Sequence, residues 1–237
     1  MTSEFTPSHN AREKGQEIIE FAFVALFFIP LLLGSVITGL GLIRSMQAQQ
    51  LCRDLDSIYI HGGDFSTYGM QQLAQRLARG LNLQIGAAFS DNQNSNTGNS
   101  GDALITLSQI TYVGPTTGAQ CTTVGAANCA NHDSFVYTQR VQFGNGTLAS
   151  LNTAALASPA PAAVSSAGNI QDPLTDAGAK VPGSSQTQLQ NAWQVSGSGR
   201  TPLVDGQVLY VVEVYLQSPG ISLGPASLGP IYVRYYF

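Results

Sequence analysis

Residues 21–43 read FAFVALFFIPLLLGSVITGLGLI, an apolar stretch of 23 residues without a charged side chain. An α-helix of this length measures roughly 35 Å, because each residue adds about 1.5 Å. The hydrocarbon core of a bilayer is about 30 Å thick, so such a helix crosses it with some tilt. A helix buried in a soluble core is usually shorter and keeps a polar stripe. The stretch therefore predicts one membrane span.

The residues after this stretch predict that the helix continues and is not removed. Secretory signal peptides have an apolar core of about 7–15 residues and a small-residue cleavage site. This run is longer, and the chain continues RSMQAQQLC without such a site. Met46, Leu51, Leu55 and Ile58 then recur at near-helical spacing. One long helix is expected over residues 17–60.

Charge indicates only weakly which side of the membrane the remainder occupies. Lysine and arginine concentrate on the cytoplasmic side of a span. Here Arg12 and Lys14 precede the span, and Arg44 and Arg53 follow it. The large, polar, cysteine-bearing remainder favours the outside. A net charge of −4 with scattered basic residues offers no surface for nucleic acid.

The part beyond the span is predicted to be an α+β domain with an antiparallel β-sheet. Residues 67–85 place four apolar side chains on one helical stripe. These are Met70, Leu73, Leu77 and Leu81. We expect this stripe to face the sheet, with glutamines and arginines on the other side.

Four stretches have the composition of strands, and they are residues 103–113, 134–144, 208–216 and 231–237. In the first, the apolar residues change parity, which a bulge near Ser108 and Gln109 would reconcile. In the second, alternation predicts a single apolar face carrying Phe135, Tyr137, Val141 and Phe143. The third is apolar on both sides except at Glu213, which is typical of a central strand covered on both faces.

Residues 145–200 are rich in Ala, Ser, Gly, Pro and Thr. Such a composition does not build a packed core. It predicts a flexible surface insertion with one short helix near residues 186–195. The expected divisions after residue 15 are a transmembrane helix (16–43), amphipathic helices (44–88) and an extracytoplasmic β-rich domain (89–237).

Cys121 and Cys129 stand close together in a loop rich in glycine and asparagine. Outside the cytoplasm they are expected to form a disulfide, worth roughly 2–3 kcal/mol. Free thiols, or a zinc site completed by His132 and Asp133, are the alternatives. The spacing is not that of a zinc motif, so no metal is expected. Cys52 is expected to be a small packed residue.

No constellation of residues predicts catalysis. Residues 220–224 match G-x-S-x-G, but this motif needs a following helix and a later histidine. Pro225 follows at once, and no histidine lies beyond His132. The chain is expected not to be an enzyme and to need no cofactor.

A short motif, REKGQEIIEF at residues 12–21, stands where the chain enters the span. Gly15 lies five residues before Glu20, a carboxylate at the edge of hydrocarbon that is costly without a partner. The motif resembles the class III signal of type IV pilin-like proteins. The resemblance implies that a prepilin peptidase cuts between Gly15 and Gln16, so that residues 1–15 are a leader peptide. It also implies that Glu20 meets the new amine of a neighbouring subunit.

Gly15, Glu20, Phe21 and Ala22, with VVEVY at residues 211–215, are similar to the TadE-like pseudopilins of the tight-adherence (Flp) pilus. The resemblance implies a minor pseudopilin of a bacterial inner membrane, with its N-terminus in the cytoplasm and its domain in the periplasm. It would take part in assembling a pilus or a related secretion apparatus. The implied partners are a prepilin peptidase, other pilins and pseudopilins, the inner-membrane assembly platform and the lipid bilayer.

Two other functions remain open from the residues alone. An uncleaved, signal-anchored ectodomain would bind a ligand such as a cell-wall glycan through its aromatic strands. A membrane-tethered hydrolase is the third hypothesis.

Overall fold

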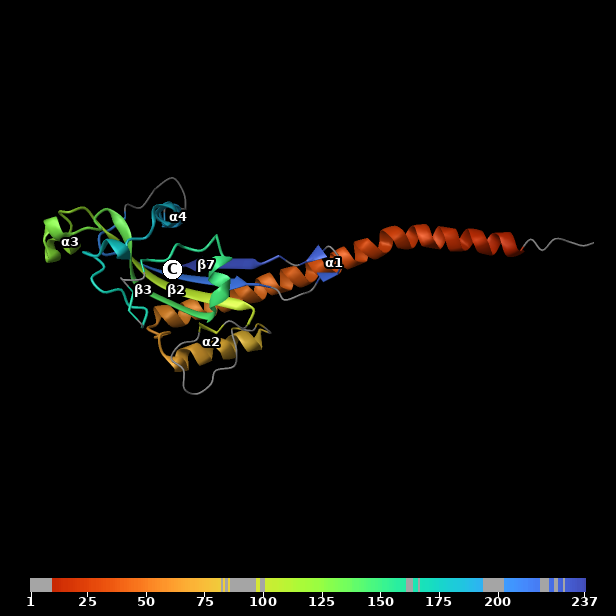
Figure 1. Ribbon diagram of the computed structural model, residues 1–237, viewed down its shortest axis with the longest axis horizontal. Helices are drawn as coiled ribbons and strands as arrows, with labels where there is room; N and C mark the ends of the chain where they lie inside the picture. Colours follow the sequence, from red (N-terminus) through yellow and green to blue (C-terminus); the bar gives the residue numbers. More distant parts are fainter. Residues whose placement is uncertain are drawn as a thin grey trace, which may run out of the picture. The chain divides into compact units, whose positions relative to one another are not determined.

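The computed structural model describes residues 10–81, 83, 85, 97–98, 101–160, 164–165, 167–193, 203–217, 222–223, 226–227 and 229–237 (Figure 1). The chain divides into two units. One comprises Met1–Ile43 and Gly220–Leu228, and the other comprises Arg44–Pro219 and Gly229–Phe237. We call the second unit the head. A hairpin of β5 (Ser222–Leu223) and β6 (Ala226–Ser227) belongs to the first.

Helix α1 (Asn10–Ile60) runs unbroken through both units, and Pro30 lies inside it. Its two parts differ sharply in burial. Phe21 and Phe27 are each 73% exposed, whereas Leu51 and Leu55 are fully buried. The prediction of one long helix through residue 60 is confirmed. Its second part belongs to the core of the head.

The head contains a four-stranded antiparallel sheet in the order β3-β2-β4-β7, with the short β1 parallel to β3 at one edge. The strands are β1 (Thr97–Gly98), β2 (Ala103–Val113), β3 (Ser134–Asn145), β4 (Val208–Leu216) and β7 (Ile231–Tyr236). The α+β class and all four predicted strands are confirmed. As expected, β4 is an inner strand.

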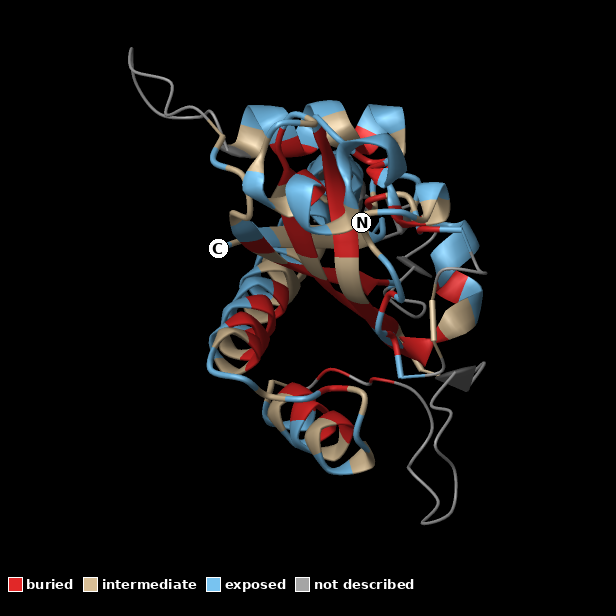
Figure 2. Ribbon diagram, turned by 90° about the vertical axis from the view of Figure 1, so that its left-hand side faces the viewer, coloured by how far each residue is buried: buried red, intermediate tan, exposed pale blue. Residues whose placement is uncertain are grey.

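One face of the sheet is covered by the second part of α1 and by α2 (Tyr68–Gly80). Leu51, Leu55 and Phe65 pack there against strand residues such as Ile105 and Phe143. Figure 2 shows buried residues along the strands and on the sides of the helices that face them. The hydrophobic contact between residues 44–60 of α1 and the sheet therefore makes this part of the helix a structural element of the head.

The predicted orientation of α2 is wrong in part. Leu73 is 39% exposed, and Met70, Leu77 and Leu81 are only partly buried. The buried face instead carries two alanines and two glutamines, namely Gln71, Ala74, Gln75 and Ala78.

The two glutamines can be buried because each donates a hydrogen bond to a backbone carbonyl of the segments that flank α2. Gln71 donates to Phe65 O and Gln75 donates to Ile85 O, both at 2.9 Å. A buried amide that keeps its partner carries little penalty. The alanines bring α2 close to its neighbours, which larger side chains would prevent.

The bulge lies in β3 and not in β2. Gln109 pairs with Gln139 and Ile110 pairs with Tyr137, so Thr138 is the extra residue. Because an extra residue reverses which side the following side chains face, the apolar residues of β3 do not share one face. Phe135 and Tyr137 lie in the core opposite the helices, whereas Val141 and Phe143 lie on the helix side.

The second face of the sheet is covered by the crossover between β3 and β4, which corrects the expectation of a surface insertion. Its described part holds η2 (Gly146–Ser150), η4 (Ala177–Ala179) and α4 (Gly183–Trp193). Six of its described apolar residues are buried against the sheet, namely Leu148, Leu156, Ile170, Ala179, Val181 and Leu189. The predicted short helix is present as α4. A few well-spaced apolar side chains suffice, because the sheet supplies the rest of this core.

The crossover also passes along the outer edge of β3. Arg140 N donates to Gly168 O at 2.7 Å, and Ile170 N donates to Thr138 O at 3.0 Å. Gly168 has a φ of +78°, and a Cβ there would lie 2.5 Å from Arg140 O. Only glycine permits both the turn and this close approach.

We expect Gly168→Ala to destabilise the head by about 2–3 kcal/mol, because it adds backbone strain to a steric clash. Urea unfolding of the full chain in detergent, followed by circular dichroism, measures this loss. Gly183→Ala is the matched control, since a Cβ there meets nothing within 4 Å. Equal stability of the two variants would contradict the close packing of the crossover on β3.

Candidate functional site

The residues of the membrane-entry motif all lie on the first part of α1. Gly15 is within the helix, and Gln16, Glu20 and Phe21 are exposed. Gln16 and Glu20 are four residues apart, so their side chains leave the same side of the helix one turn from each other. Among the described side chains, Glu20 has no hydrogen-bond or ion-pair partner.

The apolar surface that follows Glu20 has no cover within the described chain. From Ile18 to Ile43, 14 large apolar residues are exposed. At roughly 1.5 kcal/mol for each side chain, leaving them in water costs on the order of 20 kcal/mol. That exceeds the net stability of an ordinary domain, about 5–15 kcal/mol. This surface therefore requires a membrane or other apolar partners.

By length and composition, α1 is the one helix in the described part of the chain that could cross a membrane. Its most apolar window has a mean hydropathy of 2.4. It therefore suits a membrane anchor or a signal segment.

A buried carboxylate, Glu213 on β4, lies at the centre of the face that the crossover covers. Only 1% of its side chain is exposed. Its Oε1 accepts from Leu156 N at 2.9 Å, from Arg234 Nε at 3.0 Å and from the Tyr232 hydroxyl. The guanidinium of Arg140 lies 3.9 Å from Oε2. In the sequence, Glu213 stands out only as the charged residue of an otherwise apolar strand.

The two arginines tie this carboxylate to the crossover. Arg140 donates to Leu156 O at 2.9 Å, and Arg234 donates to Ala154 O at 2.6 Å and to Gln188 at 2.8 Å. Three strands and the crossover therefore meet at one charge network. Burial, and then the charge of Glu213, raise the pKa of Tyr232, so its phenol stays protonated as a donor.

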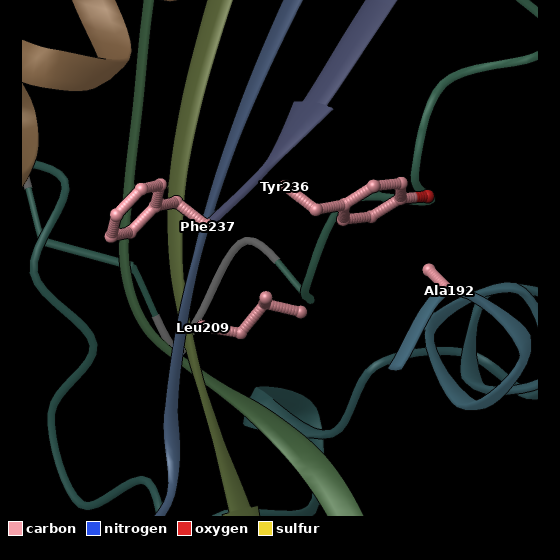
Figure 3. A pocket seen from close by; sticks show the side chains of 4 residues that line it. All are labelled: Ala192, Leu209, Tyr236 and Phe237. Carbon is pink, nitrogen blue, oxygen red and sulfur yellow. The ribbon is translucent and has the colours of Figure 1, made fainter. Parts of the chain in front are cut away.

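A shallow groove lies where β4 and β7 approach α4, on the same face as Glu213. Its volume is about 220 Å³, and its described lining consists of Ala192, Leu209, Tyr236 and Phe237. Figure 3 shows the rings of Tyr236 and Phe237 pointing to opposite sides of the strand, with Leu209 and Ala192 on the side of Tyr236. The lining is mainly apolar and carries no group suited to acid–base chemistry at neutral pH.

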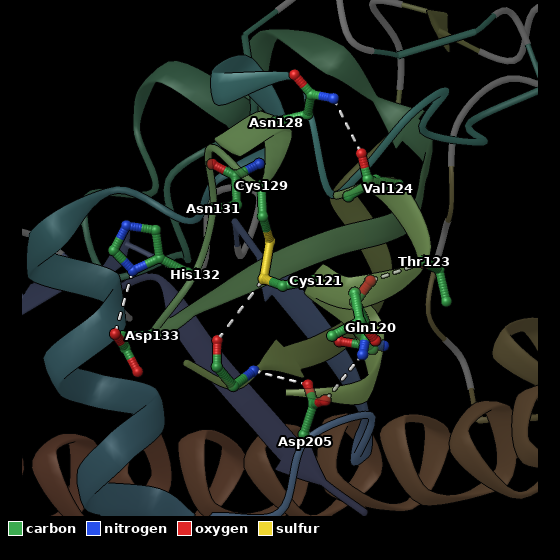
Figure 4. The surroundings of a disulfide bond; sticks show 12 residues. Gln120, Cys121, Thr123, Val124, Asn128, Cys129, Asn131, His132, Asp133 and Asp205 are labelled. Atoms are coloured by element: carbon green, nitrogen blue, oxygen red, sulfur yellow. Dashed lines mark hydrogen bonds and ion pairs between the residues drawn. A yellow bond between two sulfur atoms is a disulfide. The ribbon is translucent and has the colours of Figure 1, made fainter. Parts of the chain in front are cut away.

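Cys121 and Cys129 form a disulfide in the connection between β2 and β3 (Figure 4). It joins α3 (Ala119–Val124) to the residue after η1 (Ala126–Asn128). Both cysteines are buried and pack with Val113 and Val136. A disulfide of this kind suits an extracytoplasmic domain.

Asp205, just before β4, also fixes the connection between β2 and β3, which forms a small lobe. Its carboxylate accepts from Gly114 N at 2.7 Å and from Gln120 N at 2.9 Å. A Cβ at Gly114 or Gly118 would lie within 3 Å of the Asp205 side chain. The lobe is therefore held by one covalent bond and one charged cap, and we interpret it as structural.

The other side chains considered for chemistry do not converge. His132 and Asp133 are exposed and contact each other at 3.1 Å, while the sulfurs of Cys121 and Cys129 are bonded to one another. Among the described residues, no three His, Cys, Asp or Glu side chains are placed to share a metal. Of the G-x-S-x-G stretch, Gly220, Ile221 and Gly224 lie outside the described residues.

Comparison with protein families, with curated proteins and with solved structures found no match. The class of the protein therefore rests on its architecture. A long N-terminal apolar helix whose second part packs on a four-stranded antiparallel sheet is consistent with a type IV pilin-like fold. No narrower family is shown.

We expect Glu213→Gln to destabilise the head by roughly 3–5 kcal/mol, because it leaves two buried guanidinium groups without a counter-charge. Urea unfolding measures the loss. Asp205→Asn is the control, since that carboxylate accepts from Gly114 N, from Gln120 N and from the Gln120 side-chain amide, and contacts no described cationic side chain. If Glu213→Gln unfolds at the same urea concentration as the unchanged chain, or loses no more stability than Asp205→Asn, Glu213 does not hold the crossover.

Proposed function

We propose that this chain is a TadE-like minor pseudopilin, made as a precursor in a bacterial inner membrane. A prepilin peptidase cuts it between Gly15 and Gln16 on the cytoplasmic side. The mature chain then takes part in assembling a Tad/Flp-type pilus or a related secretion apparatus. Its partners are other pilins and pseudopilins, the assembly platform and the bilayer. It is not itself an enzyme.

The single observation that carries this proposal is that the first part of α1 exposes its apolar side chains, whereas the second part buries them in the head. Phe21, Phe27 and Leu31 are at least 70% exposed and need an apolar partner, whereas Leu51 and Leu55 are already buried under the sheet. A secretory signal that is removed would not also supply the core of the folded domain. An anchor that stays with its head would, and pilin-like subunits have this arrangement.

Glu20 gives the proposal its specific chemistry. Removal of residues 1–15 would leave a free amine at Gln16, near the membrane surface. A carboxylate at the start of a lipid-length helix is stabilised in part by the helix dipole. An amine from an adjacent subunit would neutralise it, so that subunits stack only in the register that forms this pair.

The disulfide between Cys121 and Cys129 supports the proposed side of the membrane. Such bonds persist outside the cytoplasm and are rare within it. With the head outside, residues 1–15 face the cytoplasm, where the peptidase acts.

We expect intact-mass spectrometry to find a chain beginning at Gln16 when the protein is co-expressed with a prepilin peptidase. Gly15→Ala should abolish this cleavage, because the added methyl group interferes with the residue before the scissile bond. Gly34→Ala is the control, since its position has room for a Cβ and lies far from the cut. Full-length mass for the unchanged chain would instead favour an uncleaved, ligand-binding ectodomain.

We expect Glu20→Ala to be cleaved normally but to enter pili at least tenfold less, because it leaves the neighbour's amine unpaired in an apolar setting. Quantitative immunoblots of sheared pili and of membranes measure this ratio. Glu17→Ala, three residues earlier, is the charge-matched control and should assemble normally. Equal incorporation of both variants would rule out Glu20 as the residue that sets the register.

A further inference from the structure

At the outer edge of β7, a row of backbone groups has no partner among the described residues. Tyr210 and Phe237 exchange two backbone hydrogen bonds of 3.0 Å each at the end of the β4–β7 pair. Partners alternate along an antiparallel pair, so residues of the opposite parity turn their N–H and C=O groups away from β4. These residues are Tyr232, Arg234 and Tyr236. In the described part of the chain, no strand pairs with this edge.

The opposite edge of the sheet, formed by β3, is covered by other segments of the chain. There, β1 pairs with one end of β3, and Lys180 forms a bridge with Val136. Gly168 O accepts from Arg140 N in the middle of the strand. The crossover thus covers one edge, while the described residues leave the edge of β7 open.

The usual protection of an open edge is missing from β7. Natural edges are blunted by proline, by a bulge or by a charged side chain that faces solvent. The six residues of β7 contain no proline and pair with β4 without a shift in register. Its one charge, Arg234, turns inward to Glu213 and is 11% exposed. Nothing on the strand itself opposes the addition of another strand.

Two features beside this edge indicate what a partner strand would carry. On the face of Glu213, the groove lined by Leu209, Tyr236 and Ala192 has room for one apolar side chain. On the helix face, the exposed Arg53 guanidinium lies over the ring of Tyr235, 5.6 Å from its centre. Among the described residues Arg53 has no acidic partner.

Neighbouring residues of an extended strand point to opposite faces of a sheet. A strand laid along β7 could therefore place an apolar side chain in the groove and, at the adjacent position, a carboxylate beside Arg53. Tyr235 and Tyr236 are themselves adjacent, so both subsites lie at the same end of β7. The backbone edge, the groove and the unpaired cation then fit one ligand.

We propose that the edge of β7 binds an extended segment of a partner protein that carries an acidic residue next to an apolar one. The segment adds a further strand, antiparallel or parallel, to the sheet beside β7. Main-chain hydrogen bonds to Tyr232, Arg234 and Tyr236 hold it, and the apolar–acidic pair selects it. The inference does not depend on cleavage at Gly15 or on the role of Glu20.

The test uses the full chain in detergent micelles and a fluorescent decapeptide of threonines with one central Glu-Leu pair. Fluorescence anisotropy up to millimolar peptide should show saturable binding. A Lys-Leu peptide should bind about fivefold more weakly, because it loses the pairing with Arg53. Arg53→Glu should reverse this preference. Arg76→Glu, an exposed charge on α2, is the matched control and should not change it.

Strand addition is distinguished from simple apolar binding by two peptides that are N-methylated at alternate residues. One set of amides would face β7 and the other would face solvent, so one peptide should lose at least tenfold in affinity and the other should bind as before. Hydrogen exchange should slow at Tyr232, Arg234 and Tyr236 when the peptide binds. Equal binding of both methylated peptides would overturn the proposal. So would absence of binding, or a second copy of the chain that occupies β7 and is not displaced.

Discussion

The structure depends on one constraint: a single unbroken helix has two apolar parts that need different surroundings. From residue 44 on, α1 buries Leu51 and Leu55 against its own sheet. Before that point, the same helix exposes Phe21, Phe27 and Leu31. The helix cannot satisfy both parts in water, because the exposed part alone would cost on the order of 20 kcal/mol. A bilayer or another apolar partner would resolve this conflict.

Both faces of the sheet in the head are covered, and residues 44–60 of α1 form part of one covering layer. One layer of α1 and α2 covers one face of the sheet, and the β3–β4 crossover covers the other. Glu213, with Arg140 and Arg234, fixes the crossover from inside, while the glycine at 168 lets it approach the edge of β3. Removing one partner of a buried ion pair is strongly destabilising, because the other charge is left uncompensated. The charge network therefore explains how a segment of low apolar content is held in one place.

The elements of the fold could be predicted from sequence because their signals are local. The length of residues 21–43, the alternation in the four strands and the spacing of Leu51 and Leu55 each depend on nearby residues. The predictions that failed all depend on contacts between residues far apart in the sequence. A single bulge at Thr138 divides one predicted face between two cores, and the buried face of α2 depends on carbonyls that accept from Gln71 and Gln75. Likewise, the role of Glu213 could not be predicted, because its partners Arg140 and Arg234 lie on other strands.

The central claim, that one helix passes from lipid into a folded head, can be measured with nitroxide labels on the full chain in lipid nanodiscs. One label replaces Leu31, in the middle of the apolar run, and the other replaces Ser57, about 20 Å beyond Ile43 along the helix and exposed. We expect oxygen, which concentrates in hydrocarbon, to relax the label at residue 31, and a water-soluble nickel complex to relax only the label at residue 57. Relaxation of both labels by the nickel complex would contradict a membrane-embedded first part of α1.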